Sequence, residues 1–479
     1  MRVAGYILCC MLAGSQPASQ PTSQPLSTSA VGAANVGQPW GSVQGVVQFR
    51  GNPTHTWYGV GPLPTRPRVL WRFPRQTKMC AQSPIGDQPK EWCGTGWTGQ
   101  PVVRERADGV TELIFGAFDR KVHFLDAATG QRTRPDFATR DIIKGTVSID
   151  PDGYPLIYFG SRDNKLRIVA LDRERPTELW ALDAYAVKGL YNDDWDGNPT
   201  VIDDLLIEGG ENGYLFVVAL NRRYDSAGLV SVAPEIKLAY PAWNDALLHR
   251  LHDLNISIES SVAVFGNRIY ASNSGGRVFG LDLAAARQGQ ALVVFDYWAG
   301  DDVDASIVID QQGMLYIGVE EERRLPAARG LGQLIKLDPA RSGDPVVWRL
   351  RIPGLPGDPR GGGIWSTPAL HRGVLYATSQ SGQLLAIDRD SGQVLWRQFL
   401  GSHLWSSPVV VDDTLLVATR RGILYFYDVT DARLRVPLGH TLVGRGGCIE
   451  STPLVYRGRI YVGSWDGYLY ALGDPASDR

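Results

Sequence analysis

A pattern of short strand, tight turn, strand, glycine-containing turn and strand repeats along the 479-residue chain and restricts its fold more than any other feature. Three clear copies begin at Trp365, Trp405 and Glu450, each of which is followed by Ser-Thr-Pro or Ser-Ser-Pro. Five weaker copies precede them. The motif proline or its equivalent falls at Pro101, Val147, Pro199, Val262, Ile307, Pro368, Pro408 and Pro453. Such self-similarity is typical of propellers and solenoids, whose units bury their apolar faces against their neighbours.

Several units show a fourth strand, as at Glu178–Trp180 and Val394–Trp396, but the last unit lacks one. A matching segment, Arg68–Phe73, stands before the first unit. We therefore expect an all-β, eight-bladed propeller of four-stranded antiparallel blades, closed by this N-terminal strand, which completes the last blade. Closure would remove the free sheet edges that an open solenoid, the alternative, would expose.

The first forty residues differ in composition from the repeats. Met1-Arg2 precedes an apolar run, Val3 to Ala13, and then small residues, which is the pattern of a secretory signal. We expect a signal peptide at 1–15, a Ser/Pro/Gln-rich disordered tether at 16–40 and the propeller at 41–479. A buried first strand is the alternative for the apolar run. We expect the protein to be secreted or periplasmic. The sequence leaves open whether it associates with the outer membrane and whether the leader is lipidated.

Composition excludes several other classes of protein. The 48 Lys and Arg residues are balanced by 50 Asp and Glu, so a general nucleic-acid binder, with its basic excess, is not expected. Hydrophobic residues make up 44% of the chain, which excludes wholesale disorder. No apolar stretch approaches the length of a membrane-spanning helix. We expect a soluble monomer.

Three cysteines lie outside the leader: Cys80, Cys93 and Cys448. In an oxidising compartment Cys80 and Cys93 could form a disulfide that closes a short loop, although their spacing alone does not fix the geometry. Cys448 is interpreted as an inert core thiol. The sequence contains no CxxCH haem motif and no CxxC metal pair.

The turn between the third and fourth strands carries the most characteristic residues. Ala386–Trp396 (AIDRDSGQVLW) resembles the blade motif of the pyrroloquinoline quinone (PQQ) repeat propellers, and Ala170–Trp180 is a second good match. Asp and Gly shape the turn, while the flat Trp wedges between blades. The resemblance runs from about residue 67 to 473. Because this family includes quinoprotein dehydrogenases as well as non-catalytic scaffolds such as BamB, of the outer-membrane assembly machinery, it implies a fold but not a function.

In such a ring the residue three positions before each motif proline should face the mouth of the central channel. These residues are Thr98, Lys144, Asp196, Glu259, Asp304, Trp365, Trp405 and Glu450. Carboxylate oxygens suit Ca²⁺, so Asp196, Glu259 and Asp304 are candidate metal ligands. Lys144, Trp365 and Trp405 are candidate cofactor-binding residues, because an indole plane could stack on a flat cofactor. Alternatively, these side chains only solvate the channel entrance, with Lys144 partly neutralising the acids.

The resemblance to quinoprotein alcohol dehydrogenases would imply PQQ and calcium in the funnel, but several departures oppose it. The disulfide between adjacent cysteines has no counterpart outside the leader. The GGKNGY segment of those enzymes corresponds to Gly209–Tyr214, in which Glu211 replaces the Lys, although Asp194-Trp195-Asp196 does resemble the dehydrogenase blade. We therefore assign no catalytic residue and expect a non-catalytic scaffold module that binds a protein. Its possible role is BamB-like, in outer-membrane protein assembly. The alternative to a scaffold is a PQQ- and calcium-dependent dehydrogenase that acts on an alcohol or sugar.

The expected partner is an envelope protein or peptide bound at rim loops and blade edges. Residues 221–257 form the longest insertion and could provide a partner-contact loop. Within it, His249 and His252 indicate a surface helix, with a metal-binding pair as the alternative.

Overall fold

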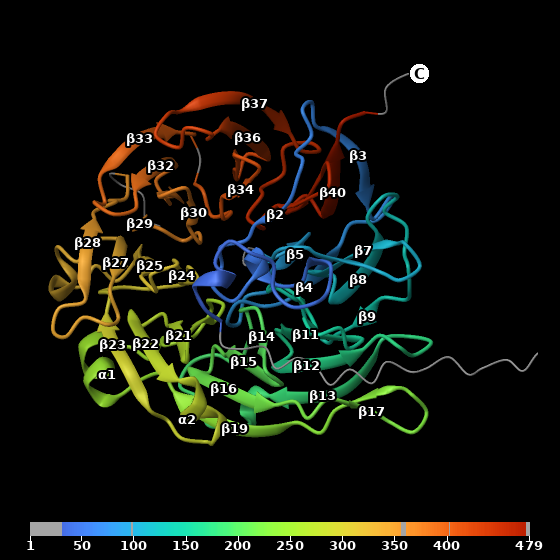
Figure 1. The fold of residues 1–479 in the computed structure, drawn as a ribbon, viewed down its shortest axis with the longest axis horizontal. Helices are drawn as coiled ribbons and strands as arrows, with labels where there is room; N and C mark the ends of the chain where they lie inside the picture. Colours follow the sequence, from blue (N-terminus) through green and yellow to red (C-terminus); the bar gives the residue numbers. More distant parts are fainter. Residues whose placement is uncertain (1–30, 97–98, 356–360, 402, 476–479) are drawn as a thin grey trace, which may run out of the picture.

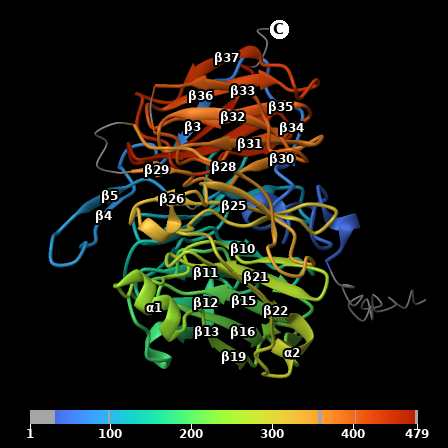
Figure 2. The ribbon, with the colours of Figure 1, turned by 90° about the vertical axis from the view of Figure 1, so that its left-hand side faces the viewer.

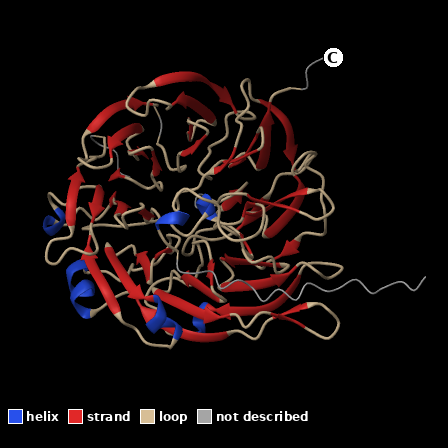
Figure 3. Cartoon of the chain, viewed as in Figure 1, coloured by secondary structure: helices blue, strands red, loops and turns tan. Residues whose placement is uncertain are grey.

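The structure, a computed structural model, describes residues 31–475 except 97–98, 356–360 and 402. Eight sheets surround a central axis (Figure 1), and strands dominate every one of them (Figure 3). The expected all-β, eight-bladed propeller is therefore confirmed. No helix in the described part of the chain has the length and apolar character needed to cross a membrane.

Each blade contains four antiparallel strands, of which the first named lines the channel and the last lies at the rim of the ring. Blade 1 has β6 (Val102–Glu105), β7 (Thr111–Ala117), β8 (Lys121–Asp126) and β9 (Phe137–Ala138), and blade 2 has β10 (Ser148–Ile149), β11 (Leu156–Ser161), β12 (Lys165–Ala170) and β13 (Thr177–Asp183). Blade 3 has β14 (Thr200–Ile202), β15 (Leu205–Gly209), β16 (Tyr214–Ala219) and β19 (Glu235–Pro241), and blade 4 has β20 (Ala263–Phe265), β21 (Arg268–Ser272), β22 (Arg277–Asp282) and β23 (Val293–Trp298).

The second half of the ring repeats this plan. Blade 5 has β24 (Val308–Ile309), β25 (Leu315–Gly318), β27 (Leu334–Leu337) and β28 (Val346–Leu350), and blade 6 has β30 (Ala369–His371), β31 (Val374–Thr378), β32 (Gln383–Asp388) and β33 (Val394–Phe399). Blade 7 has β34 (Val409–Val411), β35 (Thr414–Ala418), β36 (Ile423–Asp428) and β37 (Val436–Leu442), and blade 8 has β38 (Leu454–Tyr456), β39 (Arg459–Ser464), β40 (Tyr468–Gly473) and β3 (Arg68–Phe73).

Short elements decorate the blades. They are β1 (Gly45–Val46), β2 (Gly59–Val60), the hairpins β4–β5 (Cys80–Gln82, Glu91–Cys93) and β17–β18 (Arg223–Tyr224, Val230–Ser231), the pair β26–β29 (Glu320–Glu321, Gly362–Gly363), helices α1 (Asp245–Leu251) and α2 (Leu283–Arg287), and 3₁₀ turns at Ala33–Asn35, Phe49–Gly51, Ala184–Ala186 and Pro326–Ala328. The β4–β5 hairpin projects from one face of the ring, and the N-terminal segment lies on the opposite face (Figure 2).

The N-terminal strand β3 closes the ring, as the repeat pattern predicts. It pairs antiparallel with β40, with Trp71 opposite Ala471 and Arg72 opposite Tyr470. Phe73, at the end of this strand, is buried and packs edge-on against Phe115 of blade 1. The last blade is thus built from both ends of the described chain.

The Ser or Thr that precedes the motif proline links each blade to the one before it. Ser261 Oγ accepts a hydrogen bond from the backbone N–H of Asn198 at 3.1 Å, and Ser306 Oγ accepts one from Ser261 at 2.9 Å. The series continues with Thr367 Oγ1 and Ser407 Oγ, each at 3.0 Å from the N–H of the preceding motif. The repeated hydroxyl therefore satisfies buried N–H groups around the channel, which explains its recurrence in the sequence.

Residues 45–60, which we call the strap, cross one face of the ring at its centre (Figure 1). The strap begins with β1, which extends blade 1 by pairing with β6, and it ends with β2, which pairs parallel with β38 of blade 8. Between these strands the strap forms one hydrogen bond with each of blades 2 to 5. In blade order these bonds are Ile149 N to Val47 O (2.7 Å), Phe49 N to Asn198 Oδ1 (2.9 Å), Val264 N to Pro53 O (2.9 Å) and Ile309 N to Thr54 O (3.1 Å).

Two strap side chains reach the remaining blades. The fully buried guanidinium of Arg50 donates to the carbonyl oxygens of Pro368 in blade 6 (2.8 Å) and Pro408 in blade 7 (2.9 Å). It also lies 4.5 Å from the ring centre of Tyr58, whose hydroxyl accepts from Leu370 N at 2.7 Å and donates to Leu370 O at 3.1 Å. The strap thus contacts all eight blades and covers the channel at this face.

Residues 31–40, which by composition belong to the expected tether, pack against the propeller. Val31 and Trp40 are buried in the core between blades 3 and 4, and Trp40 Nε1 donates to Val201 O at 3.2 Å. Residues 31–40 therefore pack with the propeller, before the expected boundary at residue 41, because Val31 and Trp40 are buried between two blades. The predicted signal peptide and most of the tether lie outside the described residues.

The segment 221–257, expected to be an insertion, provides β19, the outer strand of blade 3, and then the expected helix. Asn244 caps α1 by accepting a hydrogen bond from Leu247 N, and Leu247 and Leu251 form its buried side. His252 follows the last turn in a left-handed conformation, so it does not continue the helical face of His249. This geometry supports the interpretation of a surface helix.

Candidate functional site

The rim residues chosen from the repeat do gather at the mouth of the channel, on the face opposite the strap. Glu259, Asp304, Trp365 and Trp405 line one cavity there, and the strap residue Phe49 forms part of its wall. Thr98 lies outside the described residues. The spacing of the repeat brings these four side chains together, because every blade enters its innermost strand in the same way.

Lys144 lies within a group of three carboxylates. Its Nζ is 2.5 Å from Asp196 Oδ2, 3.1 Å from Glu211 Oε1 and 3.4 Å from Asp194 Oδ2. Burial alone would lower the pKa of Lys144, but the charges of these acids raise it well above its ordinary value, so the ammonium is retained. Arg162 adds a second cation through Nε, 2.7 Å from Asp194 Oδ2.

The carboxyl groups around Lys144 hold protons more strongly than usual. Burial raises the pKa of Asp194 to about 6 and that of Glu211 to about 7, in spite of the nearby ammonium. Burial also raises the pKa of Asp196 and, well above its ordinary value, that of Glu208, which lies close to Gly197. The negative charge of these acids is therefore reduced in two ways, by ion pairs with Lys144 and by partial protonation of the carboxyl groups.

A second acidic cluster, which we call the blade 4–5 cluster, comprises Glu259, Asp302, Asp304 and Glu320. Burial, and then the charges of the other acids, raise the pKa of each of them well above the ordinary value. Glu259 Oε1 accepts from Ser257 Oγ at 2.9 Å, and Asp304 Oδ1 accepts from Ser274 Oγ at 3.4 Å. Glu259 precedes the first strand of blade 4, Asp302 and Asp304 precede the first strand of blade 5, and Glu320 lies in β26, between the second and third strands of blade 5.

The two rim tryptophans stack on each other. The ring centres of Trp365 and Trp405 are 4.3 Å apart with 12° between the planes. The Arg420 guanidinium lies 4.2 Å from the ring centre of Trp405, and its Nε is 2.8 Å from Glu450 Oε1. Because Trp365 and Arg420 both lie against Trp405, little of this indole is left for a flat cofactor.

The mouth does not fit a bound quinone. The cavity between Glu259, Asp304 and the two tryptophans has a volume of about 20 Å³, close to what a single water molecule requires. A three-ring cofactor such as PQQ is far larger. The cavity at the mouth therefore does not accommodate PQQ, and we derive no redox step.

The predicted metal ligands are not brought together as one set. Among the described residues, Asp194, Asp196 and Glu211 are the one group of three or more possible ligands whose atoms all lie within 4.8 Å of one another. Lys144 Nζ contacts all three of these acids, so the chain itself supplies the cation. Glu259 and Asp304 belong instead to the blade 4–5 cluster.

Several residues of the mouth were not predicted as site residues. Asp194 and Glu211 were noticed only as parts of a family motif, and Asp302, Glu320 and Arg420 were not noticed. A usable signal existed for Glu208, a carboxylate inside the buried strand β15, where an apolar residue is expected. No comparable signal marks Arg420, because its partners come from other turns of the ring.

Cys80 and Cys93 face each other across the β4–β5 hairpin and form a disulfide. The hairpin lies near the acids of the mouth, where Arg162 Nη1 donates to Ser83 Oγ at 3.0 Å. Cys448 is only half-buried, so it is not a core residue. Burial raises the pKa of its thiol to about 12, which keeps it protonated and makes it a poor nucleophile.

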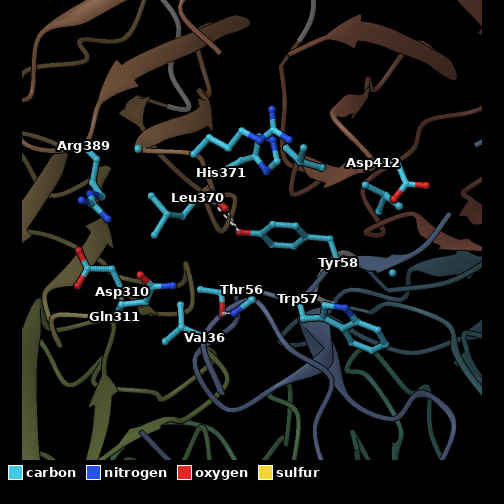
Figure 4. A pocket seen from close by; sticks show the side chains of 16 residues that line it. Val36, Thr56, Trp57, Tyr58, Asp310, Gln311, Leu370, His371, Arg389 and Asp412 are labelled. Carbon is cyan, nitrogen blue, oxygen red and sulfur yellow. Dashed lines mark hydrogen bonds between the residues drawn. The ribbon is translucent and has the colours of Figure 1, made fainter. Parts of the chain in front are cut away.

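Another cavity, of about 400 Å³, opens on the face that carries the strap (Figure 4). Tyr58 points across it toward Leu370 and His371. Two of its basic side chains already have acidic partners: His371 Nε2 lies 2.7 Å from Asp413 Oδ1, and Arg389 Nε lies 3.1 Å from Asp390 Oδ1.

Residues 330–473 match a family model described as "Outer membrane protein assembly factor BamB". The match includes blades 6 and 7 and the C-terminal strands of blade 8. Over these residues the propeller is similar to that family, whose model covers less than half of the chain. This result agrees with the family resemblance of the blade motif at Ala386–Trp396.

The curated relatives of this propeller are similar to it over a limited region. The outer membrane protein assembly factor BamB of Escherichia coli (strain K12) is 29% identical over 133 residues, which are 26% of this chain and 31% of the relative. The BamB of Shewanella oneidensis is 42% identical over 66 residues, which are 14% and 17% of the two chains. The aligned regions thus span less than a third of these relatives.

The propeller is also similar to solved structures. The quinohemoprotein alcohol dehydrogenase from Comamonas testosteroni superposes with a TM-score of 0.54 at 14% identity, covering 91% of this chain and 82% of that one. At this identity the likeness shows the fold alone.

Proposed function

We propose that this PQQ-type propeller is a non-catalytic scaffold that binds an extended segment of a partner protein along the outer edge of blades 6 to 8. The proposal rests on one observation: the outermost strands of these three blades expose a row of apolar side chains. Phe399 of β33, Val436, Leu438 and Leu442 of β37, and Val69 and Leu70 of β3 are all exposed. Exposed apolar side chains that cluster in this way typically mark interaction sites.

The backbone of β37 is available for pairing with another strand. In the described structure β37 is bonded on one side only, to β36, which leaves the N–H and C=O groups of its outer side without a neighbouring strand. Leu438, in the middle of β37, is 58% exposed. An unpaired edge with apolar side chains is suited to accept an extended peptide as an additional strand.

The charge of this edge indicates the chemistry of the partner. β33, β37 and β3 contain Arg397, Arg68 and Arg72 but no Asp or Glu, whereas the outer strands of blades 2, 3 and 4 contain carboxylates such as Glu178 and Asp296. An extended segment that alternates apolar and acidic residues would therefore complement blades 6 to 8 and would be disfavoured at blades 2 to 4.

A groove beside β37 could hold the side chains of such a segment. It has a volume of about 600 Å³ and lies between residues 62–68 and β37, with Leu63, Phe426 and Leu438 among its lining residues. Its apolar lining beside Arg66 and His440 matches the chemistry inferred from the strands.

The test uses a fluorescein-labelled peptide of about ten residues, the length of a long strand, that alternates Val or Phe with Glu. We expect saturable fluorescence anisotropy with the intact protein. Leu438→Ser, which removes an apolar contact without adding a charge, should weaken binding by about tenfold. Leu254→Ser is the matched control, because Leu254 is 52% exposed but lies far from this edge, and it should bind normally. Equal binding by both variants, or no binding by the intact protein, would refute the proposal.

We further propose that the scaffold operates in the cell envelope, in outer-membrane protein assembly. Support comes from the BamB match over residues 330–473 and from the signal-like composition of residues 1–15. A fusion of residues 1–40 to a phosphatase that is active only after export should give activity, and a fusion with charged residues placed within Val3 to Ala13 should not. An inactive first fusion would refute export.

A further inference from the structure

His123 of β8 is buried at the joint where the two ends of the ring meet. Its imidazole lies between Phe115 of blade 1 and Phe73 of the closing strand β3, with ring centres 5.2 Å and 4.9 Å away. Both phenylalanines belong to the core that blades 8 and 1 share, and Figure 1 shows β3 at this junction. A titratable group therefore lies inside the packing that holds the closing strand.

Both ring nitrogens of His123 face carboxylates. Nε2 donates to Asp119 Oδ1, in the turn after β7, at 3.0 Å. Nδ1 lies 3.1 Å from Asp136 Oδ1, just before β9, in an ion pair that lacks hydrogen-bond geometry. A neutral imidazole has one N–H and one lone pair, so one nitrogen would direct its lone pair at a carboxylate oxygen. The arrangement therefore fits the doubly protonated imidazolium.

The charged groups around the ring keep this proton in place. Burial alone would lower the pKa of His123, but its contacts with Asp119 and Asp136 raise the pKa above its ordinary value of 6.5. Burial would raise the pKa of Asp136, but His123 and Arg132, with Nη2 2.9 Å from Asp136 Oδ2, lower it to about 2. The groups that β3 and β7 contribute at the imidazole are aromatic rings.

The closing strand is connected to these charges through Phe73. Besides the imidazole of His123, the guanidinium of Arg132 lies near this ring, 4.8 Å from its centre. An aromatic ring is attracted to a nearby cation, and more strongly where water is excluded.

We propose that the His123 imidazolium is a proton-dependent latch for ring closure. While His123 holds its proton, it neutralises Asp119 and Asp136 and β3 stays docked on blade 1 through Phe73. When the proton is lost, the two carboxylates face a neutral ring, the attraction for Phe73 weakens, and β3 separates from blade 1 more readily.

The sign of the pKa shift of His123 makes this latch open on the alkaline side. A group whose pKa is raised by folding contributes its full stabilisation below the unfolded value, here 6.5, and loses it as the pH rises through the folded value. The latch goes beyond the proposed peptide-binding edge and does not depend on it, because its test uses no peptide.

The first measurement is the titration of His123 itself. NMR of the full-length protein with ¹³C-labelled histidine side chains follows each imidazole with pH, and His123→Gln identifies the signal by its absence. We expect the His123 signal to titrate above pH 6.5. Asp119→Asn, which removes one of the two charges, should move this titration to lower pH. A His123 that titrates at or below pH 6.5 in the intact protein would overturn the proposal.

The second measurement is the release of β3. In hydrogen exchange followed by mass spectrometry, and corrected for the intrinsic exchange rate, the β3 amides should lose protection as the pH rises through the His123 titration. Those of β33, the outermost strand of blade 6, should not lose protection in step with it. In His123→Gln, β3 should exchange faster at neutral pH and show no such step. His371→Gln is the matched control, because His371 also pairs with a carboxylate, that of Asp413, but lies in blade 6.

Two further results would refute the latch. If His123 titrates above pH 6.5 while the protection of β3 does not change with it, the proton is not coupled to closure. If the step in protection persists in His123→Gln, another group controls β3. Should His123→Gln not fold, Asp119→Asn decides, because its step should move to lower pH, and an unmoved step would contradict the proposal.

Discussion

Arg50 Nη1 donates a hydrogen bond of 2.9 Å to the carbonyl oxygen of Pro408, which lies 358 residues further along the chain. A second bond from the same guanidinium reaches Pro368, and a third joins Nε to the carbonyl oxygen of His55 at 3.2 Å. The cation is fully buried, and each of these acceptors is a main-chain oxygen. Arg50 thus satisfies carbonyl groups of two blades that the ring itself leaves unpaired.

Substitution of Arg50 by Met should destabilise the whole propeller. The buried carbonyls of Pro368 and Pro408 would lose their donor, which should lower the free energy of unfolding by about 2 to 4 kcal/mol. Urea unfolding followed by tryptophan fluorescence measures this. Arg457→Met is the control, because Arg457 forms an exposed ion pair with Glu105, and its effect should be less than about 1 kcal/mol. Equal effects would show that the strap is not important for stability.

The closing strand should behave as part of the core. Phe73 is buried, and its ring centre lies 4.9 Å from that of His123 and 6.1 Å from that of Phe115. Phe73→Ala should cost about 3 to 5 kcal/mol, as expected for a large cavity. Leu70→Ala, on the same strand but exposed, should cost much less. Thermal unfolding of both variants distinguishes a closed ring from an open one, in which the two changes would have similar, small effects.

Lys144→Met should be strongly destabilising at neutral pH, since it leaves Asp194, Asp196 and Glu211 without their ammonium. Loss of one partner of a buried ion pair costs about 3 to 5 kcal/mol. The raised pKa values of Asp194 (about 6) and Glu211 (about 7) would rise further, so the folded variant would bind more protons than the unfolded chain. Its stability should therefore fall as the pH rises from 4 to 7.

The Lys144 variant should accordingly recover most of its stability at low pH, where the three acids are neutral. Unfolding in urea at several pH values tests this. Lys237→Met, which removes an exposed pair with Glu235, should change little at any pH. A pH-independent loss in Lys144→Met would contradict the electrostatic explanation.

His55 should make the protein sensitive to acid. Its Nδ1 donates to the carbonyl oxygen of Ile307 at 2.7 Å, and burial lowers its pKa from 6.5 to about 4. Between these values the unfolded chain binds a proton that the folded protein does not, so the free energy of unfolding falls as the pH is lowered from 6.5 to 4. This contribution amounts to about 3 kcal/mol.

The acids at the mouth change the free energy of unfolding with pH in the opposite direction to His55. Comparing the pH dependence of the free energy of unfolding between the intact protein and His55→Gln therefore isolates the contribution of His55. The variant should show a smaller loss of stability on acidification. Identical pH profiles would refute the role of His55.

The repeat predicted the blades because each unit is a local hairpin with its own apolar alternation. The ring closure was also predictable, since Arg68–Phe73 has the pattern of a fourth strand and the last unit lacks one. The rim positions followed from the same regularity. These features depend on patterns that are repeated, and a repeat is visible in a single sequence.

The partners at the mouth could not be predicted in this way. Glu211 was interpreted as a reversal of charge where the related dehydrogenases have a Lys. In the structure Glu211 pairs with the ammonium of Lys144, which comes from the preceding blade. Such pairing depends on side-chain positions across two blades, which no local pattern encodes.

The strap was missed for a similar reason. Its residues, including Arg50, Asn52 and His55, are polar and lack strand periodicity, so no pattern in the sequence marks the segment. Their partners are main-chain groups at the ends of eight separate strands. Burial of these side chains becomes apparent only when the ring is assembled around them.

A ribosome makes the strap long before it makes the last blades. Until Pro408 has been synthesised, Arg50 lacks one of its hydrogen-bond acceptors, and until Val455 has been synthesised, β2 lacks its partner strand. The strap residues that become buried at the centre of the ring therefore stay in water until then. Whichever blades form early, the disc therefore cannot be completed until the chain's C-terminal strands have returned to its beginning.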